Sequence, residues 1–257
     1  MFDPGFEISW QANPLGFTYG SGVFGPEVEN RKLEDIRNSL RNPSAAGPEV
    51  VYSIVMDVGM NEHRSILQEK MLLFGVVTYA DGQLGEEPVR SQGHIHAVSS
   101  HSGWSPPEIY EIWEGQAIIY MQETAKDDPG RCFAVSAGPG DVVVVPPNWA
   151  HATINADPQN HMTFGAWCDR EYGFEYSDVR ERKGLAWYPL IKEGELSWDH
   201  NSNYQNTGLI IKTPREYPEL GLKAGIPIYE QFKKDPSLFQ FVSKPYLKEM
   251  EWDNFIP

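Results

Sequence analysis

The chain has 257 residues, of which 40% are hydrophobic and 22% are charged. This composition is ordinary for a globular protein with one sizeable core, so we expect one domain with additions rather than two full domains. The formal net charge of −15 argues against nucleic acid and against an anionic membrane surface as partners, because both attract basic surfaces. A small anionic substrate stays compatible, since donors in a closed site outweigh a distant net charge that is screened over roughly 10 Å.

The two cysteines, Cys132 and Cys168, have no CxxC partner. This favours free thiols in a reducing compartment over a secreted disulfide scaffold. The opening segment, MFDPGFEISW, lacks the basic and apolar regions of a signal peptide. The longest apolar-rich run, residues 71–80, has about half the length that a membrane helix requires. We therefore expect a cytoplasmic protein.

In chain order, the first predicted element is an extended arm over residues 1–30, where aromatic residues alternate with Gly and Pro. Residues 30–40 carry Leu33, Ile36 and Leu40 at spacings of three and four, which predicts a short amphipathic helix. Later segments are rich in Val, Ile, Tyr and Phe and are separated by turn sequences such as DPG and GPG, which is typical of strands. The predicted strands are residues 50–57, 71–79, 88–97, 109–122, 132–135, 142–145, 152–155 and 162–167.

Eight or so short strands with tight turns predict an all-β fold, either a sandwich or a closed barrel of the jelly-roll kind. The chain from about residue 194 is different, since it is rich in Tyr, Pro and Asn and has one clear helical stretch near residues 227–232. We therefore expect three parts: an N-terminal arm and helix at residues 1–48, a barrel at 49–192, and a C-terminal extension that wraps around the barrel at 193–257.

His94 and His96 lie two residues apart in a predicted strand, so both side chains are expected to project from the same face. Imidazole is a common ligand for zinc, iron, nickel and copper. Seven histidines in a chain of this length would produce an HxH pair by chance in roughly one chain in five. The pair therefore needs support from the residues that follow it.

That support comes from a resemblance to the cupins, which are small metal-binding jelly-roll barrels. Glu108 and Gly115 have the spacing E-x6-G that closes the first cupin motif. The second motif, G-x5-P…H-x3-N, is matched by Gly140, Pro146, His151 and Asn155. The resemblance implies a double-stranded β-helix barrel that holds one divalent metal per chain. The implied metal ligands are His94, His96, Glu108 and His151.

The chain departs from the general cupin pattern between the first motif's ligands. Residues 97–107 separate His96 from Glu108, whereas cupins usually have only three or four residues there. We expect this Ser-rich insertion to bulge over the mouth of the barrel, with His101 as a loop or substrate contact rather than a ligand. A second departure is Asn148, which stands where a glycine is usual.

A closer resemblance rests on GHIHA at residues 93–97, PEIY at 107–110 and PPNWAH at 146–151. These motifs are similar to those of the cupin-type glucose-6-phosphate isomerases of archaea and bacteria, over roughly residues 30–190. The resemblance implies Fe2+, Mn2+, Zn2+ or Ni2+ as the metal, a homodimer, and interconversion of glucose 6-phosphate and fructose 6-phosphate. The residue that matches Glu108 is the favoured proton-transfer base in that family.

This chemistry is compatible with the residue types present. Aldose–ketose interconversion moves a proton between C1 and C2 of the sugar, and a carboxylate such as Glu108 can act first as base and then as acid. A divalent metal supplies Lewis-acid stabilisation of the enediolate charge. Tyr110 lies two residues after Glu108, so it either donates to a sugar oxygen or packs under the barrel floor.

The expected substrate contacts include an anion-binding segment. Ser91 and Gly93 keep a Ser/Thr-x-Gly pattern that contributes donors to the 6-phosphate in the related family. Val76 and Trp167 align with a family threonine and tyrosine, so two hydroxyls are missing. Arg is well suited to planar anion contacts, and it is otherwise a common surface residue. The candidate replacement or additional contacts are Arg90, Arg170 and Tyr172.

Several functions remain open at this stage. An isomerase of another 6-substituted hexose, such as sulfoquinovose, is favoured by the altered anion contacts. An iron cupin dioxygenase would use the same three histidines and one glutamate, and a non-catalytic sugar-binding cupin would bind without turnover. Oxygen uptake, compared with anaerobic sugar interconversion, separates the dioxygenase from the isomerases.

Overall fold

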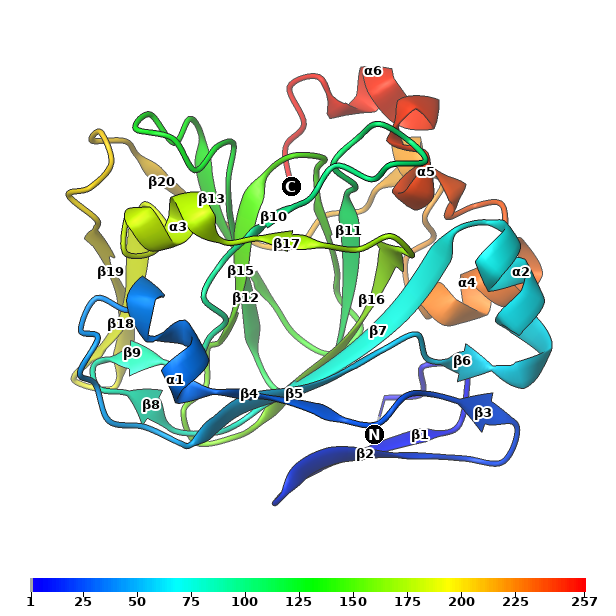
Figure 1. Cartoon of the computed structure of the whole chain (residues 1–257), viewed down its shortest axis with the longest axis horizontal. Helices are drawn as coiled ribbons and strands as arrows, with labels where there is room; N and C mark the ends of the chain where they lie inside the picture. The colour runs from blue at the N-terminus through cyan, green and yellow to red at the C-terminus, as the bar shows by residue number, and fades with distance from the viewer. Residues whose placement is uncertain (1) are drawn as a thin grey trace.

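The computed structural model describes residues 2–257, and its centre is a barrel made of two β-sheets (Figure 1). One sheet has the strand order β14-β11-β16-β7-β5-β4, and the other has the order β15-β12-β13-β20. All neighbouring strands in these sheets are antiparallel except β13 and β20, which are parallel. The predicted all-β jelly-roll barrel is therefore confirmed. The barrel strands are β4 (Glu29–Lys32), β5 (Val50–Met56), β7 (Leu72–Tyr79), β11 (Glu108–Glu114), β12 (Ala117–Gln122), β13 (Cys132–Ala137), β14 (Val142–Val145), β15 (Ala150–Asn155), β16 (Met162–Asp169) and β20 (Leu209–Lys212).

The N-terminal region contains more regular structure than an extended arm. Strands β1 (Ile8–Ala12) and β2 (Leu15–Tyr19) form a hairpin, and β3 (Val23–Phe24) pairs with β6 (Gly59–Met60). The helix predicted over residues 30–40 starts later than expected, because residues 29–32 join the large sheet as β4. Only α1 (Leu33–Ile36) and the 3-10 turn η1 (Arg37–Ser39) are helical there.

The strand predicted over residues 88–97 is only partly formed. It contains the end of the short hairpin β8 (Gln83–Leu84) and β9 (Glu87–Pro88), and later β10 (Ile95–His96). Isolated bridges join Arg90 to Ile154 and His94 to His151. The segment predicted as one strand over 109–122 is a pair of strands, β11 and β12, which separate at Gly115. The positive φ of 78° at Gly115, where a Cβ would lie 2.6 Å from the His161 carbonyl oxygen, requires glycine.

Strands β7 and β16 are buried on both faces and therefore divide two apolar cores. The inward side chains of β7, including Val77 and Tyr79, belong to the core inside the barrel, whereas Val76 belongs to the core on the outer face. On β16, Ala166 and Cys168 face inward and Trp167 faces outward. The alignment that placed Val76 and Trp167 at the anion site is therefore wrong, because alternate residues of a strand point to opposite faces.

The C-terminal residues cover the outside of the barrel. Figure 1 shows α4 beside β7 and β16, α5 and α6 above α4 toward the top of the view, and β18 and β19 near the opposite end of the molecule. The Trp167 ring stacks on Tyr229 of α4 with centroids 5.6 Å apart, and it also contacts Phe232 and Phe239. The remaining elements are η2 (Asn61–His63), α2 (Arg64–Glu69), β17 (Phe174–Glu175), α3 (Ser177–Glu181), β18 (Trp187–Lys192), β19 (Glu195–His200), η3 (Pro218–Leu220), α4 (Ile228–Lys234), α5 (Gln240–Ser243), η4 (Pro245–Lys248) and α6 (Glu249–Trp252).

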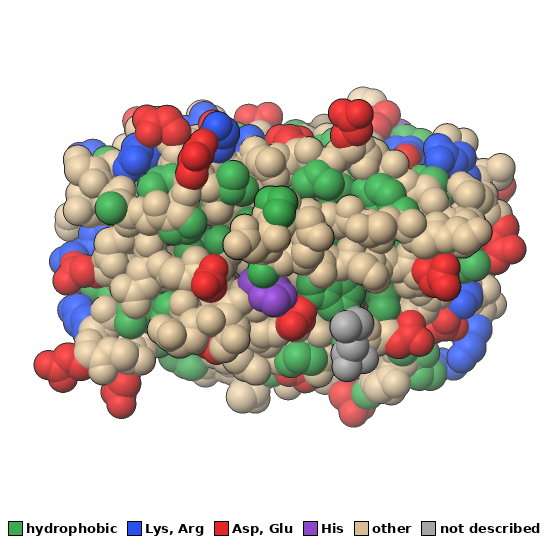
Figure 2. All heavy atoms as spheres, turned by 90° about the horizontal axis from the view of Figure 1, so that it is seen from below, with side chains coloured by type: hydrophobic (Ala, Val, Ile, Leu, Met, Phe, Trp, Pro, Cys, Tyr) green, Lys and Arg blue, Asp and Glu red, His purple; other side chains and the backbone are tan. Residues whose placement is uncertain are grey.

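Two surface features bear on partners. On the face drawn in Figure 2, acidic and basic side chains are interspersed around the rim, and its described atoms form no continuous basic stripe. Among residues 2–257, no helix is long and apolar enough to cross a membrane.

Candidate metal centre

Four side chains converge near one end of the barrel interior. Their ligand atoms all lie within 4.8 Å of one another. A metal with bonds of about 2.1 Å separates its ligand atoms by at most about 4.2 Å, so the side chains need to close by only a few tenths of an ångström. We call this set the ligand cluster, and it consists of His94, His96, Glu108 and His151.

Main-chain partners orient two of the imidazoles. His96 Nδ1 lies 2.9 Å from the Pro106 carbonyl oxygen, and His151 Nδ1 lies 3.0 Å from the Trp149 carbonyl oxygen. A carbonyl only accepts, so Nδ1 carries the proton in each neutral ring and Nε2 keeps its lone pair. Those Nε2 atoms lie 3.2 and 3.3 Å from Glu108 Oε2. Lone pairs facing a carboxylate at this distance repel unless a cation or a proton lies between them.

The third imidazole gives an independent indication of a missing partner. Among residues 2–257, the buried His94 Nε2 has no hydrogen-bond partner, whereas buried polar atoms are nearly always paired. Burial, and then the neighbouring His151 and His96, hold the pKa of His94 well below its usual value. A neutral, unpaired imidazole nitrogen is the form that binds a metal. The residues present therefore fit a divalent metal ion.

Glu108 is held from both sides by donors of the barrel wall. Tyr110 Oη donates to Oε2 at 2.6 Å, and Cys168 Sγ donates to Oε1 at 3.2 Å. Burial favours the protonated carboxyl, but the hydrogen bonds and positive charge that His151 and His96 supply when they carry a second proton outweigh it and keep the pKa of Glu108 well below its usual value. The side chain is therefore an oriented carboxylate, able to bind a cation and to accept a proton.

A pocket extends from the ligand cluster between the two sheets. Its wall near the ligand cluster includes Tyr110 and Cys168, and it also contains Ser91 from the segment before the HxH pair. Ser91, which was expected to contact the substrate, therefore lines the pocket. Its Oγ accepts a hydrogen bond from the Thr153 amide at 3.1 Å. Gly93 has a φ of 87°, and a Cβ there would lie 2.8 Å from Leu185 Cδ1, so the close approach of this segment requires glycine.

The structure places the other expected substrate contacts away from the pocket wall. Arg90 is buried and fully engaged, since its guanidinium donates to Glu87 Oε2, to the Ser91 carbonyl and to the Ser39 carbonyl. It faces a different cavity. Arginine at this position therefore serves the fold, because its donors are already used by buried acceptors.

Arg170 and Tyr172 are also outside the pocket lining. Arg170 makes a two-point ion pair with Asp57 at 2.7 and 2.8 Å and donates to the Leu72 carbonyl. Tyr172 is 43% exposed and lies beside Phe174, with ring centroids 5.7 Å apart. The expectation that these side chains supply the anion contacts is not supported by their positions.

The residue that sequence reasoning missed is Arg31. It reaches the pocket from β4, and the same wall contains Tyr52 and Tyr176. Within the part of the chain that the structure describes, Arg31 Nε is buried without a hydrogen-bond partner, and the guanidinium pairs with Glu29, whose side chain is 65% exposed. The only signal in the sequence was a basic residue at the end of the N-terminal arm, which is a common surface feature.

Comparisons with known proteins indicate the family of the chain. The family described as "Glucose-6-phosphate isomerase (GPI)" matches residues 31–207, which is more than half of the chain. A glucose-6-phosphate isomerase of Thermococcus kodakarensis is 28% identical over 138 residues, 54% of this chain and 67% of that protein. One from Thermococcus gammatolerans is 29% identical over 171 residues, covering 65% and 82% of the two chains. A putative glucose-6-phosphate isomerase 1 of Rhizobium meliloti is 32% identical over 132 residues, covering 51% and 56%.

Among solved structures, a deletion mutant of Bacillus subtilis oxalate decarboxylase has a TM-score of 0.36 at 14% identity, over 51% of this chain and 30% of that one. The family match includes every member of the ligand cluster as well as Arg31. On the extent of that match, and with the jelly-roll barrel described above, the chain belongs to the cupin-type glucose-6-phosphate isomerase family.

Proposed function

We propose that this chain is a metal-dependent aldose–ketose isomerase that interconverts glucose 6-phosphate and fructose 6-phosphate. The observation that carries the proposal is the ligand cluster at one end of a pocket, with an unpaired His94 Nε2 and an oriented Glu108 carboxylate. Family membership supports the sugar phosphate as substrate.

The ligand cluster would hold the metal, and a bound divalent ion supplies Lewis-acid stabilisation of the charge on the sugar's C1–C2 oxygens. Glu108 removes the proton from C2 of the aldose and returns it to C1. Tyr110 and Cys168 keep the carboxylate in place by hydrogen bonds to its two oxygens. The apolar barrel wall excludes water, which slows loss of the transferred proton to solvent.

The anionic 6-substituent is assigned to the part of the pocket formed by Arg31, Tyr52 and Tyr176. An unpaired guanidinium N–H inside a pocket is suited to an oxyanion, because a charge-assisted hydrogen bond restores the partner that the buried donor lacks. The exposed Glu29 competes only weakly, since surface ion pairs are worth little. A 6-sulfonate offers the same acceptor chemistry with less charge, so 6-sulfo sugars are the second candidate substrate.

The test of the isomerase is turnover under anaerobic conditions after metal removal and add-back. The metal-free protein is expected to be inactive, and one divalent metal per chain is expected to restore activity. His94→Ala should lose the metal, whereas the control His200→Ala, at a histidine whose Nε2 is paired with the Gln205 carbonyl, should retain it. Unchanged metal content and activity in His94→Ala would remove the basis for the metal centre.

The proton-transfer role is tested separately with Glu108→Gln and deuterated water. Gln keeps a ligand oxygen but cannot accept and return a proton at neutral pH. We expect a loss of kcat of at least about 100-fold with a much smaller change in KM. Wild-type product should carry deuterium at C1 or C2 at long times. Product with no deuterium would indicate a hydride shift, with Glu108 acting as a ligand alone.

A further inference from the structure

The insertion of residues 97–107, here called the insertion loop, contacts a metal-ligand residue directly. Ser105 Oγ donates to the His96 carbonyl at 2.7 Å, and the Pro106 carbonyl accepts from His96 Nδ1 at 2.9 Å. Ser105 Oγ also accepts from the Asn148 amide at 3.2 Å. The end of the insertion loop therefore sets both the position and the tautomer of the His96 ring.

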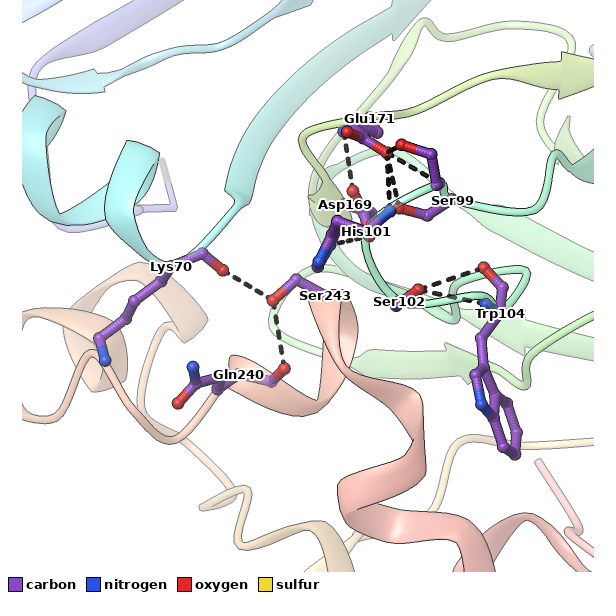
Figure 3. Close-up of polar contacts among 10 residues, drawn as sticks. Lys70, Ser99, His101, Ser102, Trp104, Asp169, Glu171, Gln240 and Ser243 are labelled. Atoms are coloured by element: carbon purple, nitrogen blue, oxygen red, sulfur yellow. Dashed lines mark hydrogen bonds and ion pairs between the residues drawn. The ribbon is translucent and has the colours of Figure 1, made fainter.

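The other end of the insertion loop is fixed by one carboxylate oxygen, Glu171 Oε2. It accepts from Ser99 Oγ at 3.1 Å, from the Ser100 amide and Oγ at 2.8 Å each, and from the His101 amide at 3.2 Å. Figure 3 shows Ser99 and His101 turned toward Glu171 and Asp169. The loop is thus attached to the segment that follows β16 and not only to its own ends.

Asp169 ties this attachment to the barrel. Its Oδ1 accepts from the Glu171 amide at 2.7 Å, and its Oδ2 lies 3.1 Å from His101 Nε2. Asp169 is the last residue of β16, directly after the Cys168 that bonds to Glu108. The end of β16 therefore contacts Glu108 through the inward-facing Cys168 and the insertion loop through the next residue, Asp169.

The attachment is separable from the folding of the loop itself. The loop closes on its own backbone through the Ser99 amide to the Trp104 carbonyl at 2.9 Å and the Gly103 amide to the Ser99 carbonyl at 2.8 Å. Glu171 takes part in neither bond and lies at the exposed surface. Its removal leaves these two bonds in place and breaks the four contacts to Oε2, so that fewer bonds hold the turn to the segment after β16 and the turn can shift relative to His96.

We propose that Glu171 is a positioning residue of the metal centre, which holds His96 in its ligating geometry through the insertion loop. The inference rests on the proposed metal-dependent function. It explains why this chain keeps a long insertion between two of its metal ligands, because the insertion supplies the partner of His96 Nδ1 and is itself anchored to the barrel.

The test uses the full-length, metal-loaded protein and three forms: wild type, Glu171→Ala and the control Glu175→Ala. Glu175 lies four residues further along the same segment and is exposed. The primary measurement is the rate at which excess EDTA removes the metal, followed by direct metal analysis. The thermal unfolding midpoint of each metal-free protein reports any general loss of stability.

We expect Glu171→Ala to release the metal about tenfold faster, because loss of a partner behind a metal ligand typically costs 10–100-fold in affinity. Glu175→Ala should stay within about twofold of wild type, and the metal-free midpoints of all three should agree. Cobalt(II) loaded into Glu171→Ala should show shifted visible absorption bands, which a change in stability alone would not cause. Glu171→Gln keeps one acceptor oxygen, so its rate of metal release should lie between those of wild type and Glu171→Ala.

Equal release rates for wild type and Glu171→Ala would overturn the inference. An equally faster release of the metal from Glu171→Ala and Glu175→Ala would also overturn it. The cause would then be the loss of a negative charge and not the loss of the loop contact. Failure of wild type to retain any metal would reject the metal centre itself. Retention by wild type with no effect of Glu171→Ala rejects the positioning role alone.

Discussion

Glu111 provides a quantitative test of how the C-terminal region is joined to the barrel. Its side chain is 1% exposed on β11, where Oε1 accepts from the Ile228 amide at 2.9 Å and Oε2 accepts from Trp113 Nε1 at 3.0 Å. Burial raises the pKa of this carboxyl to about 7, although both hydrogen bonds act in the opposite direction. The ionised carboxylate is therefore a cost to the folded state at neutral pH.

The magnitude follows from the two pKa values. A folded value of about 7 against 4.5 for the free group corresponds to about 3 kcal/mol when both states are fully ionised. Because the folded pKa is the higher one, the penalty is absent below pH 4.5, grows as the pH rises to 7, and is complete above it. Between pH 5 and pH 8 most of this penalty develops, an increase of about 2 to 3 kcal/mol.

The assay is urea unfolding of the metal-free wild type and Glu111→Gln at pH 5 and pH 8. Gln is neutral at both pH values and gives up one of the two hydrogen bonds, a loss of about 1 kcal/mol. With the lost hydrogen bond set against the penalty that wild type carries, the two proteins should differ by less than about 1 kcal/mol at pH 5, and the variant should be the more stable one by about 2 kcal/mol at pH 8. Other titrating groups cancel in the difference between the two proteins. A difference that is the same at both pH values would refute the reasoning.

Two further outcomes follow from the pocket and the outer core. Arg31→Met should raise KM for glucose 6-phosphate by about 10- to 100-fold, since a hydrogen bond to a charged group is worth about 1.5–3 kcal/mol. The surface control Arg41→Met should leave KM unchanged. If Arg31→Met lowered activity on unsubstituted glucose as much as on glucose 6-phosphate, the result would contradict the anion contact. Trp167→Ala should lower the free energy of unfolding by about 3–5 kcal/mol, because the indole is fully buried against Tyr229 and Phe232. An unchanged free energy of unfolding in urea would place Trp167 outside the core.

The ligand cluster and most strands were predictable because their signals are local. The spacing of the two histidines, and of Glu108 relative to Gly115, is contained in short segments, and each strand has its own composition. The structure brings the ligand cluster together as the resemblance implied. The homodimer and the choice of metal stay predictions.

The candidate substrate contacts were not predictable, for three physical reasons. Val76 and Trp167 lie on strands that are apolar on both faces, so the sequence pattern does not indicate which face is inward, and a shift of one residue exchanges them. Arg31 reaches the pocket through the pairing of β4 with β5, which no local signal specifies. Arg90 was misjudged because its buried partner, Glu87, becomes apparent only in the folded chain.

The structure also bears on the proposed division of the chain at residue 193. The C-terminal region buries Tyr229 and Phe232 against the outer face of β7 and β16, and the Ile228 amide donates to Glu111 inside the barrel wall. Because β16 places Trp167 against these helices and Cys168 against Glu108, displacement of α4 would disturb the strand that orients the proposed base. We therefore propose that residues 193–257 are a structural part of the barrel rather than a separate domain, and that the site depends on them through β16.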